Sequence, residues 1–320
     1  MKNKRTIGLS PKNVFSIFLG LFAFLVFSIM SDADMGQIHA SAAKVSEDSQ
    51  KAIIFHNLDE EVLILGTDLK AEKKTGILRF IPFPSEPAVR LAPEGSFAAA
   101  ADLIKKHGLK FIWQSKGGPP SAQPVELRFN QKLGAHDIAV IKVNDASGFR
   151  SWANDFFKKK GLPQKKEYPE VESIVDDYVR RAISWFVFDF VEVTEETRFI
   201  EPVEYRFKTK KLYYPLKTSN TFGGVGVIEL ILVLPGTLFD ALESYYTGCL
   251  GIENMKATTS VQTSPEELKA ICSDAGAFFG ERNVFIQFLR YHGEYKFNED
   301  ILADLSQAVS NAIEHKFSKN

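Results

Sequence analysis

Two acidic residues interrupt apolar, strand-like runs and are the first candidates for chemistry. Asp189 lies within ISWFVFDFVEV (183–193), and Glu229 lies within VGVIELILVL (225–234). A carboxylate held inside a sheet has a raised pKa and can act as a general acid, so a cleft containing both acids would favour a hydrolase-like enzyme. The alternative is structural, with each acid facing solvent or meeting an arginine or lysine across the sheet.

The sequence holds none of the common catalytic or phosphate-binding motifs. It contains no G-x-S-x-G, no G-x-x-x-x-G-K-S/T and no H-E-x-x-H. The histidines show no metal-ligand spacing, and we expect each to be a surface or capping residue (His39, His56, His107, His136, His292 and His315). We therefore expect no metal and no cofactor, and no catalytic residue beyond the two candidate acids.

The first 33 residues have the pattern of an export signal. Basic residues precede an uncharged apolar run from Val14 to Met30, and SDA (31–33) then places small residues where a signal peptidase cleaves. We expect cleavage after Ala33 and a mature chain in the periplasm or outside the cell. The alternative is an uncleaved leader with residues 14–30 as a membrane anchor, because a spanning helix needs about 20 apolar residues and about 17 suffice.

The charge of the mature chain argues against nucleic acid as a partner. Removal of residues 1–33 lowers Lys plus Arg from 39 to 35 and Asp plus Glu from 40 to 39, which leaves a net charge of −4. Binding to phosphates needs a clustered cationic surface, and this balance does not indicate one. Membrane contact is expected only through an uncleaved leader.

The two cysteines, Cys249 and Cys272, predict a disulfide. An exported chain carries them into a compartment where disulfides persist, and a bridge would close a loop of about two dozen residues, worth on the order of 3 kcal/mol. The alternative is a pair of buried free thiols.

Short apolar runs separated by turn residues predict strands in two groups. The runs at 51–56, 61–69 and 76–84 are typical of an antiparallel meander. Apolar residues on both faces of 183–193 indicate a central strand. Further strands are expected at 136–143, 202–208, 225–234 and 284–291.

Helix caps and apolar periodicity predict a helical middle segment. Ser96 and Gly108 bracket a helix at 97–107, and a second follows at 148–160. A third begins at Pro169, with acidic residues near its start and basic residues near its end. Weaker patterns place helices at 265–272 and 299–315.

These elements predict an α+β fold with antiparallel or mixed sheets and a helical middle segment, behind a cleavable signal peptide. We expect an extracytoplasmic domain at 34–240 and a C-terminal α+β extension at 241–320 packed on it. GGPPS (117–121) is either a domain boundary or a long surface loop.

The segment from Arg79 to Pro87 is a candidate contact surface. Two phenylalanines and three prolines in an extended chain hold their shape at low entropic cost. The alternative is a strand exit packed on the core of its own domain.

The chain resembles a family of bacterial exported proteins known as domain-of-unknown-function family 2330. The resemblance rests on HDIAVIKVNDASGFRSWANDFFKKKG, ISWFVFDFVEV, PVEYRFKTKKLYYPLKTSNT and FIPFPSEPAV, and it covers roughly residues 34–240. It implies export and an α+β extracytoplasmic domain, and it implies no known activity.

The sequence therefore favours a non-enzymatic module that binds or scaffolds a protein or polymer of the cell envelope. The alternative is an extracytoplasmic hydrolase-like enzyme that uses Asp189 and Glu229. Convergent acids in a deep pocket would favour the enzyme, and an exposed apolar patch would favour the binding module.

Overall fold

The computed structural model describes residues 36–39, 43, 45–113, 121–124, 136–221 and 224–306. All of them belong to a single compact unit. The predicted leader, the cleavage site at Ala33 and most of the loop at 117–121 lie outside the described residues.

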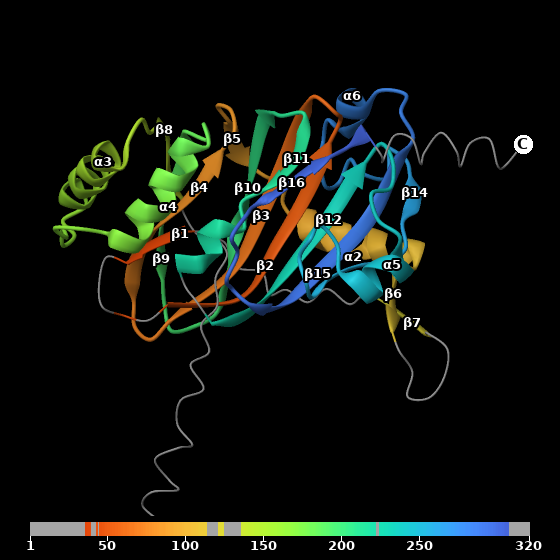
Figure 1. Ribbon diagram of the computed structural model, residues 1–320, viewed down its shortest axis with the longest axis horizontal. Helices are drawn as coiled ribbons and strands as arrows, with labels where there is room; N and C mark the ends of the chain where they lie inside the picture. The colour runs from red at the N-terminus through yellow and green to blue at the C-terminus, as the bar shows by residue number, and fades with distance from the viewer. Residues whose placement is uncertain are drawn as a thin grey trace, which may run out of the picture. The chain divides into compact units, whose positions relative to one another are not determined.

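An eight-stranded sheet forms the centre of this unit (Figure 1). Its order is β13-β15-β12-β2-β3-β10-β5, with β14 also paired to β15. The β12–β2 pair is parallel and the other pairs are antiparallel. The strands are β2 (Val45–His56), β3 (Glu60–Ala71), β5 (Ala88–Leu91), β10 (Arg198–Lys208), β12 (Val225–Leu234), β13 (Met255–Ala257), β14 (Val261–Thr263) and β15 (Val284–Glu294).

A second, four-stranded sheet lies against the first, in the order β1-β4-β9-β8. Its strands are β1 (Gly36–His39), β4 (Thr75–Phe83), β8 (Asp137–Lys142) and β9 (Trp185–Val193). Two small sheets complete the described strands. They pair β6 (Lys110–Trp113) with β7 (Ser121–Pro124), and β11 (Lys211–Tyr214) with β16 (Ile301–Asp304).

The described helices are α2 (Ser96–His107), α3 (Ala146–Lys159), α4 (Pro169–Arg180), α5 (Ala241–Thr247) and α6 (Ala275–Phe279), with a 3-10 turn at Lys217–Thr221. Helices cover the outer faces of the two sheets, chiefly α2 on the large sheet and α3 and α4 on the small one. Phe188 of β9 stacks on Phe149 of α3, so α3 packs on the four-stranded sheet. Phe97 of α2 packs with Phe199 of β10 on the other side of the eight-stranded sheet. The result is four layers: α3 and α4, the small sheet, the large sheet, and α2 (Figure 1).

Several sequence predictions are confirmed. The α+β class, the mainly antiparallel sheets and the three central helices are present. Asp145 caps α3, because its side chain accepts a hydrogen bond from the backbone of Gly148 at 2.7 Å. β9 lies between β4 and β8, as its two apolar faces predict.

The predicted meander is wrong in its third strand. β2 and β3 pair as expected, but β4 leaves them and pairs with β1 and β9 in the small sheet. β4 has buried residues on both faces, which suits a strand covered by α3 and α4 on one side and by the large sheet on the other. Residues 241–306 also contribute β13, β14 and β15 to the large sheet, beside strands from the first half of the chain.

Two helix predictions near the C-terminus and one cap are corrected. Residues 265–271 form turns, in which Glu267 folds back to accept a hydrogen bond from Ser264 N–H at 3.1 Å. Within 299–315, residues 301–304 form β16, and residues 307–320 lie outside the described part. Gly95, in the left-handed conformation at φ 77°, caps α2 in place of Ser96.

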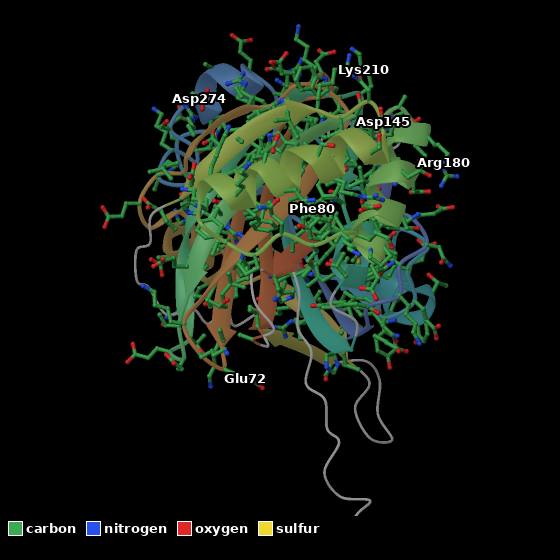
Figure 2. All side chains as sticks on the ribbon, turned by 90° about the vertical axis from the view of Figure 1, so that its left-hand side faces the viewer. Glu72, Phe80, Asp145, Arg180, Lys210 and Asp274 are labelled. Carbon is green, nitrogen blue, oxygen red and sulfur yellow. The ribbon has the colours of Figure 1, made fainter. Side chains whose placement is uncertain are left out.

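The predicted contact surface at Arg79–Pro87 is also wrong. Phe80 and Phe83 are fully buried, and Phe83 packs on Tyr205 and Phe207 of β10. In Figure 2, Phe80 lies near the centre of the view, whereas the charged residues Glu72 and Lys210 lie toward its rim. Residues 79–83 are therefore core, as the alternative interpretation predicts, whereas Glu86 in the strand exit is exposed.

The structure corrects the disulfide prediction. Cys249 and Cys272 are both free and buried, and they belong to different core clusters on opposite faces of the large sheet. The Cys249 thiol donates a hydrogen bond to the carbonyl of Met255, and the Cys272 thiol donates one to Asp274. The expected oxidising compartment and the even number of cysteines indicated a disulfide. In the structure each thiol instead has a hydrogen-bond partner close to it in the sequence.

We expect both thiols to be unreactive in the folded chain and reactive after unfolding. Burial raises the pKa of each thiol to about 12, so little thiolate exists near neutral pH. A chromogenic disulfide reagent added without reductant should titrate almost no thiol in the native chain and two per chain in denaturant. A denatured chain that shows thiols only after reduction would contradict the structure.

Candidate functional site

Asp189 is buried between the two sheets, where its Oδ2 oxygen holds two partners. Arg79, its cross-strand partner on β4, donates a charged hydrogen bond to Asp189 Oδ2. The ring nitrogens of His136 lie 2.8 Å from the same oxygen and 2.9 Å from the carbonyl of Glu201 on β10. Asp189 thus joins the two sheets through His136.

The charge environment of Asp189 opposes a role as a general acid. Burial disfavours the ionised carboxyl, but the charge of Arg79 and the hydrogen bond with His136 outweigh it and hold its pKa below the usual range. A general acid at neutral pH needs the opposite shift. The raised pKa expected from a sheet interior is therefore wrong for Asp189.

Glu229 shows the same cross-strand arrangement in the other sheet. It lies opposite Arg290 of β15, whose guanidinium donates to Glu229 Oε1, with Nε at 2.9 Å. Asp189 and Glu229 thus lie on different sheets, each held by its own arginine. Each acid therefore meets an arginine across its sheet, which was the structural alternative to a catalytic role. The two acids do not meet at one cleft.

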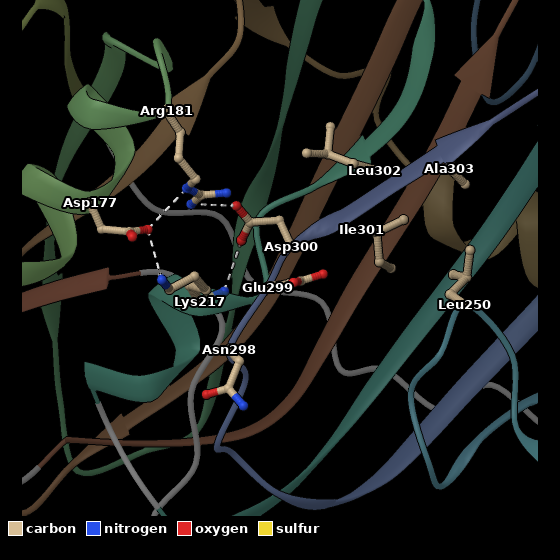
Figure 3. A pocket seen from close by; sticks show the side chains of 10 residues that line it. All are labelled: Asp177, Arg181, Lys217, Leu250, Asn298, Glu299, Asp300, Ile301, Leu302 and Ala303. Atoms are coloured by element: carbon tan, nitrogen blue, oxygen red, sulfur yellow. Dashed lines mark hydrogen bonds and ion pairs between the residues drawn. The ribbon is translucent and has the colours of Figure 1, made fainter.

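A charged pocket of about 550 Å³ lies where β16 meets α4 and the 3-10 turn (Figure 3). At its base the buried carboxylate of Asp300 accepts hydrogen bonds from Tyr178 Oη at 2.7 Å, Arg181 Nη2 at 3.0 Å and the backbone of Lys217 at 3.0 Å. Asp177 binds both Arg181 and the Lys217 side chain. Asp177 and Asp300 pair with Arg181 and Lys217 and so attach β16 to α4, while Glu299 is a third acid of the lining without a basic partner among the described residues.

A second pocket of about 590 Å³ lies between two sheet edges, and we call it the edge groove. Its lining combines β5 of the large sheet, β8 of the small sheet with His136 just before it, and one residue of β10. Leu91 and Val140 are exposed large apolar residues, at 52% and 38% of their surface. The lining residues are Val89, Arg90, Leu91, His136, Ile138, Val140 and Glu201.

One wall of the edge groove presents unpaired backbone groups of β8. Among the described residues β8 pairs only with β9, and the Val143 N–H donates to the Ser184 carbonyl at 2.8 Å in that ladder. Bonding and non-bonding residues alternate along an antiparallel pair. The backbone groups of Ile138, Val140 and Lys142 therefore point away from β9.

The other wall is the free edge of β5. This strand pairs only with β10 in the described part, and the Ala92 N–H continues that ladder to the Pro202 carbonyl at 2.9 Å. By the same alternation, the backbone groups of Val89 and Leu91 point away from β10. The residues whose backbone groups are free also supply most of the apolar lining of the groove.

The polar residues of the groove differ in how far they are already engaged. Arg90 donates to Glu204 at 2.6 Å and to Asp274 at 3.3 Å, and His136 is held by Asp189. The half-buried Glu201 has no basic partner among the described residues. Sequence reasoning missed this groove because short apolar runs predict strands but do not say which strands lie at an edge.

Comparisons with known proteins add little. No known family model matches the chain, and no curated protein matches it. A solved structure described as the crystal structure of baculovirus P35 is similar over 82% of this chain and 97% of its own, at 8% identity and a TM-score of 0.41. A likeness at that score carries no argument here, and the resemblance to family 2330 stays a prediction.

The described residues contain neither a candidate membrane span nor a candidate metal site. No helix in the described ranges is long and apolar enough to cross a membrane. No group of three or more histidine, cysteine or acidic residues in these ranges is arranged to hold a metal ion.

Proposed function

We propose that this chain is an exported, non-enzymatic module that binds a partner of the cell envelope at the edge groove. The observation that carries the proposal is the groove itself, where Leu91 and Val140 expose apolar surface between two strand edges that have no partner strand among the described residues. Exposed apolar surface rimmed by polar residues is typical of interaction sites. The leader pattern at 1–33 and the resemblance to family 2330 support export.

The binding role is better supported than the hydrolase alternative. Asp189 and Glu229 are each held by an arginine in separate sheets, and neither lines the edge groove or the charged pocket at Asp300. An enzyme with paired carboxylates needs both groups within reach of one substrate. We therefore propose the binding function and not the hydrolase activity.

A photoreactive amino acid placed at Val140 tests this function in the native cell. The Val140 variant should crosslink to a discrete envelope partner, because the side chain faces the groove lining. The matched control is Asp102, an exposed residue of α2 on the far side of the large sheet, and it should give no such product. Equal crosslinked products from the Val140 and Asp102 variants, or no product from the Val140 variant, would contradict the proposal.

A further inference from the structure

We propose that the edge groove binds an extended peptide segment of the partner, which adds as a strand along the free edge of β8, beside β5, and carries a basic side chain for Glu201. This inference rests on the proposed binding function and names its ligand class. Strand addition supplies affinity through main-chain hydrogen bonds and specificity through alternate side chains.

The backbone geometry favours a peptide over other ligands. Val89 and Leu91 on one wall turn N–H and C=O groups away from β10, and Ile138 and Val140 on the other turn theirs away from β9; none of these groups has a backbone partner in the described part of the chain. An extended chain presents donors and acceptors on both of its sides. A strand added along β8 would satisfy its outward groups and cover the apolar lining of the groove.

The side chains define what this peptide should contain. Leu91 and Val140 favour apolar residues, because a bound strand would remove their exposed surface from water. Glu201 is the acid of the groove without a basic partner in the described part of the chain, whereas Arg90 is already paired with Glu204. The charge complement of the groove is therefore one lysine or arginine flanked by apolar residues.

Several features separate this edge from ordinary exposed strand edges. Natural edges are commonly blocked by charges, prolines or a covering element. The outward positions of β5 and the first two of β8 are instead apolar, and Lys142 comes only at the end of β8. The groove volume of about 590 Å³ lies within the range of specific ligand sites.

The probe for this proposal is a fluorescein-labelled peptide of alternating threonine and valine with one lysine, titrated into the full chain by anisotropy. We expect saturable binding, and tighter binding when the lysine stands on one face of the strand than when it is moved by one position. Methylation of the peptide's backbone amides should weaken binding by about tenfold or more, because it removes donors and leaves the side chains. Equal binding of the methylated peptide would overturn strand addition.

Two variants of the chain complete the test. Val140→Pro removes an outward N–H without breaking the ladder to β9, so it should weaken the peptide by about tenfold while the unfolding midpoint stays unchanged. Glu201→Lys should weaken the lysine peptide by about fivefold and favour a glutamate peptide. If Val140→Pro does not fold, the methylated peptide still tests strand addition, because that experiment uses the unaltered chain.

The remaining outcomes separate this inference from the proposed function. Absence of peptide binding, together with a Val140 crosslink in the cell, would overturn strand addition and leave the binding function standing. A dimer of this chain that Val140→Pro abolishes and the peptide does not disrupt would also overturn it, because the occupant would then be a second copy. Loss of both the peptide and the crosslink would end both proposals.

Discussion

Replacement of Arg79 by methionine is expected to lower the free energy of unfolding by about 3–5 kcal/mol, because it leaves the Asp189 carboxylate buried without its charged partner. Both side chains are almost fully buried, at 3% and 1% exposure. His136 would remain on Asp189 Oδ2, but it also contacts the Glu201 carbonyl and cannot replace the guanidinium. Urea unfolding at pH 7 measures the loss.

The second arginine–acid pair of this chain provides a matched control. Arg290→Met removes the partner of Glu229, but 39% of the Arg290 side chain is exposed, so water screens the change and the expected loss is about 1 kcal/mol. The double variant Arg79→Met with Asp189→Leu should recover most of the stability lost with Arg79 alone. Similar losses for Arg79→Met and Arg290→Met would contradict a desolvated pair at Asp189.

The helices could be predicted from sequence because their signals are local. Asp145 caps α3 from within the same turn, and Pro169 lies in the first turn of α4. An apolar run that forms a strand is equally visible in the sequence, but the strand that it pairs with is not. β4 follows β3 after a three-residue turn and still pairs with β9, more than 100 residues away, since burial of both of its faces outweighs the short connection.

The roles of the two candidate acids depended on these long-range pairings. Asp189 and Glu229 were visible as charges in apolar strands, but their arginines are fixed only by strand register, with Arg79 opposite Asp189 and Arg290 opposite Glu229. Sequence reasoning included an ion pair as one alternative without a partner to name. The edge groove depends on which strands end each sheet, and no local pattern records that.

The protein should lose stability as the pH falls from about 6.5 to about 4, through His56. This histidine is fully buried; its Nδ1 accepts a hydrogen bond from the Leu58 N–H at 2.9 Å, and its Nε2 lies 3.2 Å from the Lys211 carbonyl. Burial lowers its pKa to about 4. The unfolded chain therefore takes up a proton over this range while the folded chain does not, which costs about 1.4 kcal/mol per pH unit and on the order of 3 kcal/mol in total.

His56→Asn tests this titration, because an asparagine oxygen can still accept from Leu58 N–H and does not titrate. The variant should be less stable near pH 7 and should show a slope of stability against pH that is smaller by about 1.4 kcal/mol per unit between pH 4.5 and 6. Glu61→Gln is the control of opposite sign: burial holds the pKa of the Glu61 carboxyl well above its usual range, so its removal should make that slope larger. Unfolding curves in urea at several pH values measure both slopes. Identical slopes for His56→Asn and the unaltered chain would show that His56 takes up its proton equally in the folded and unfolded states.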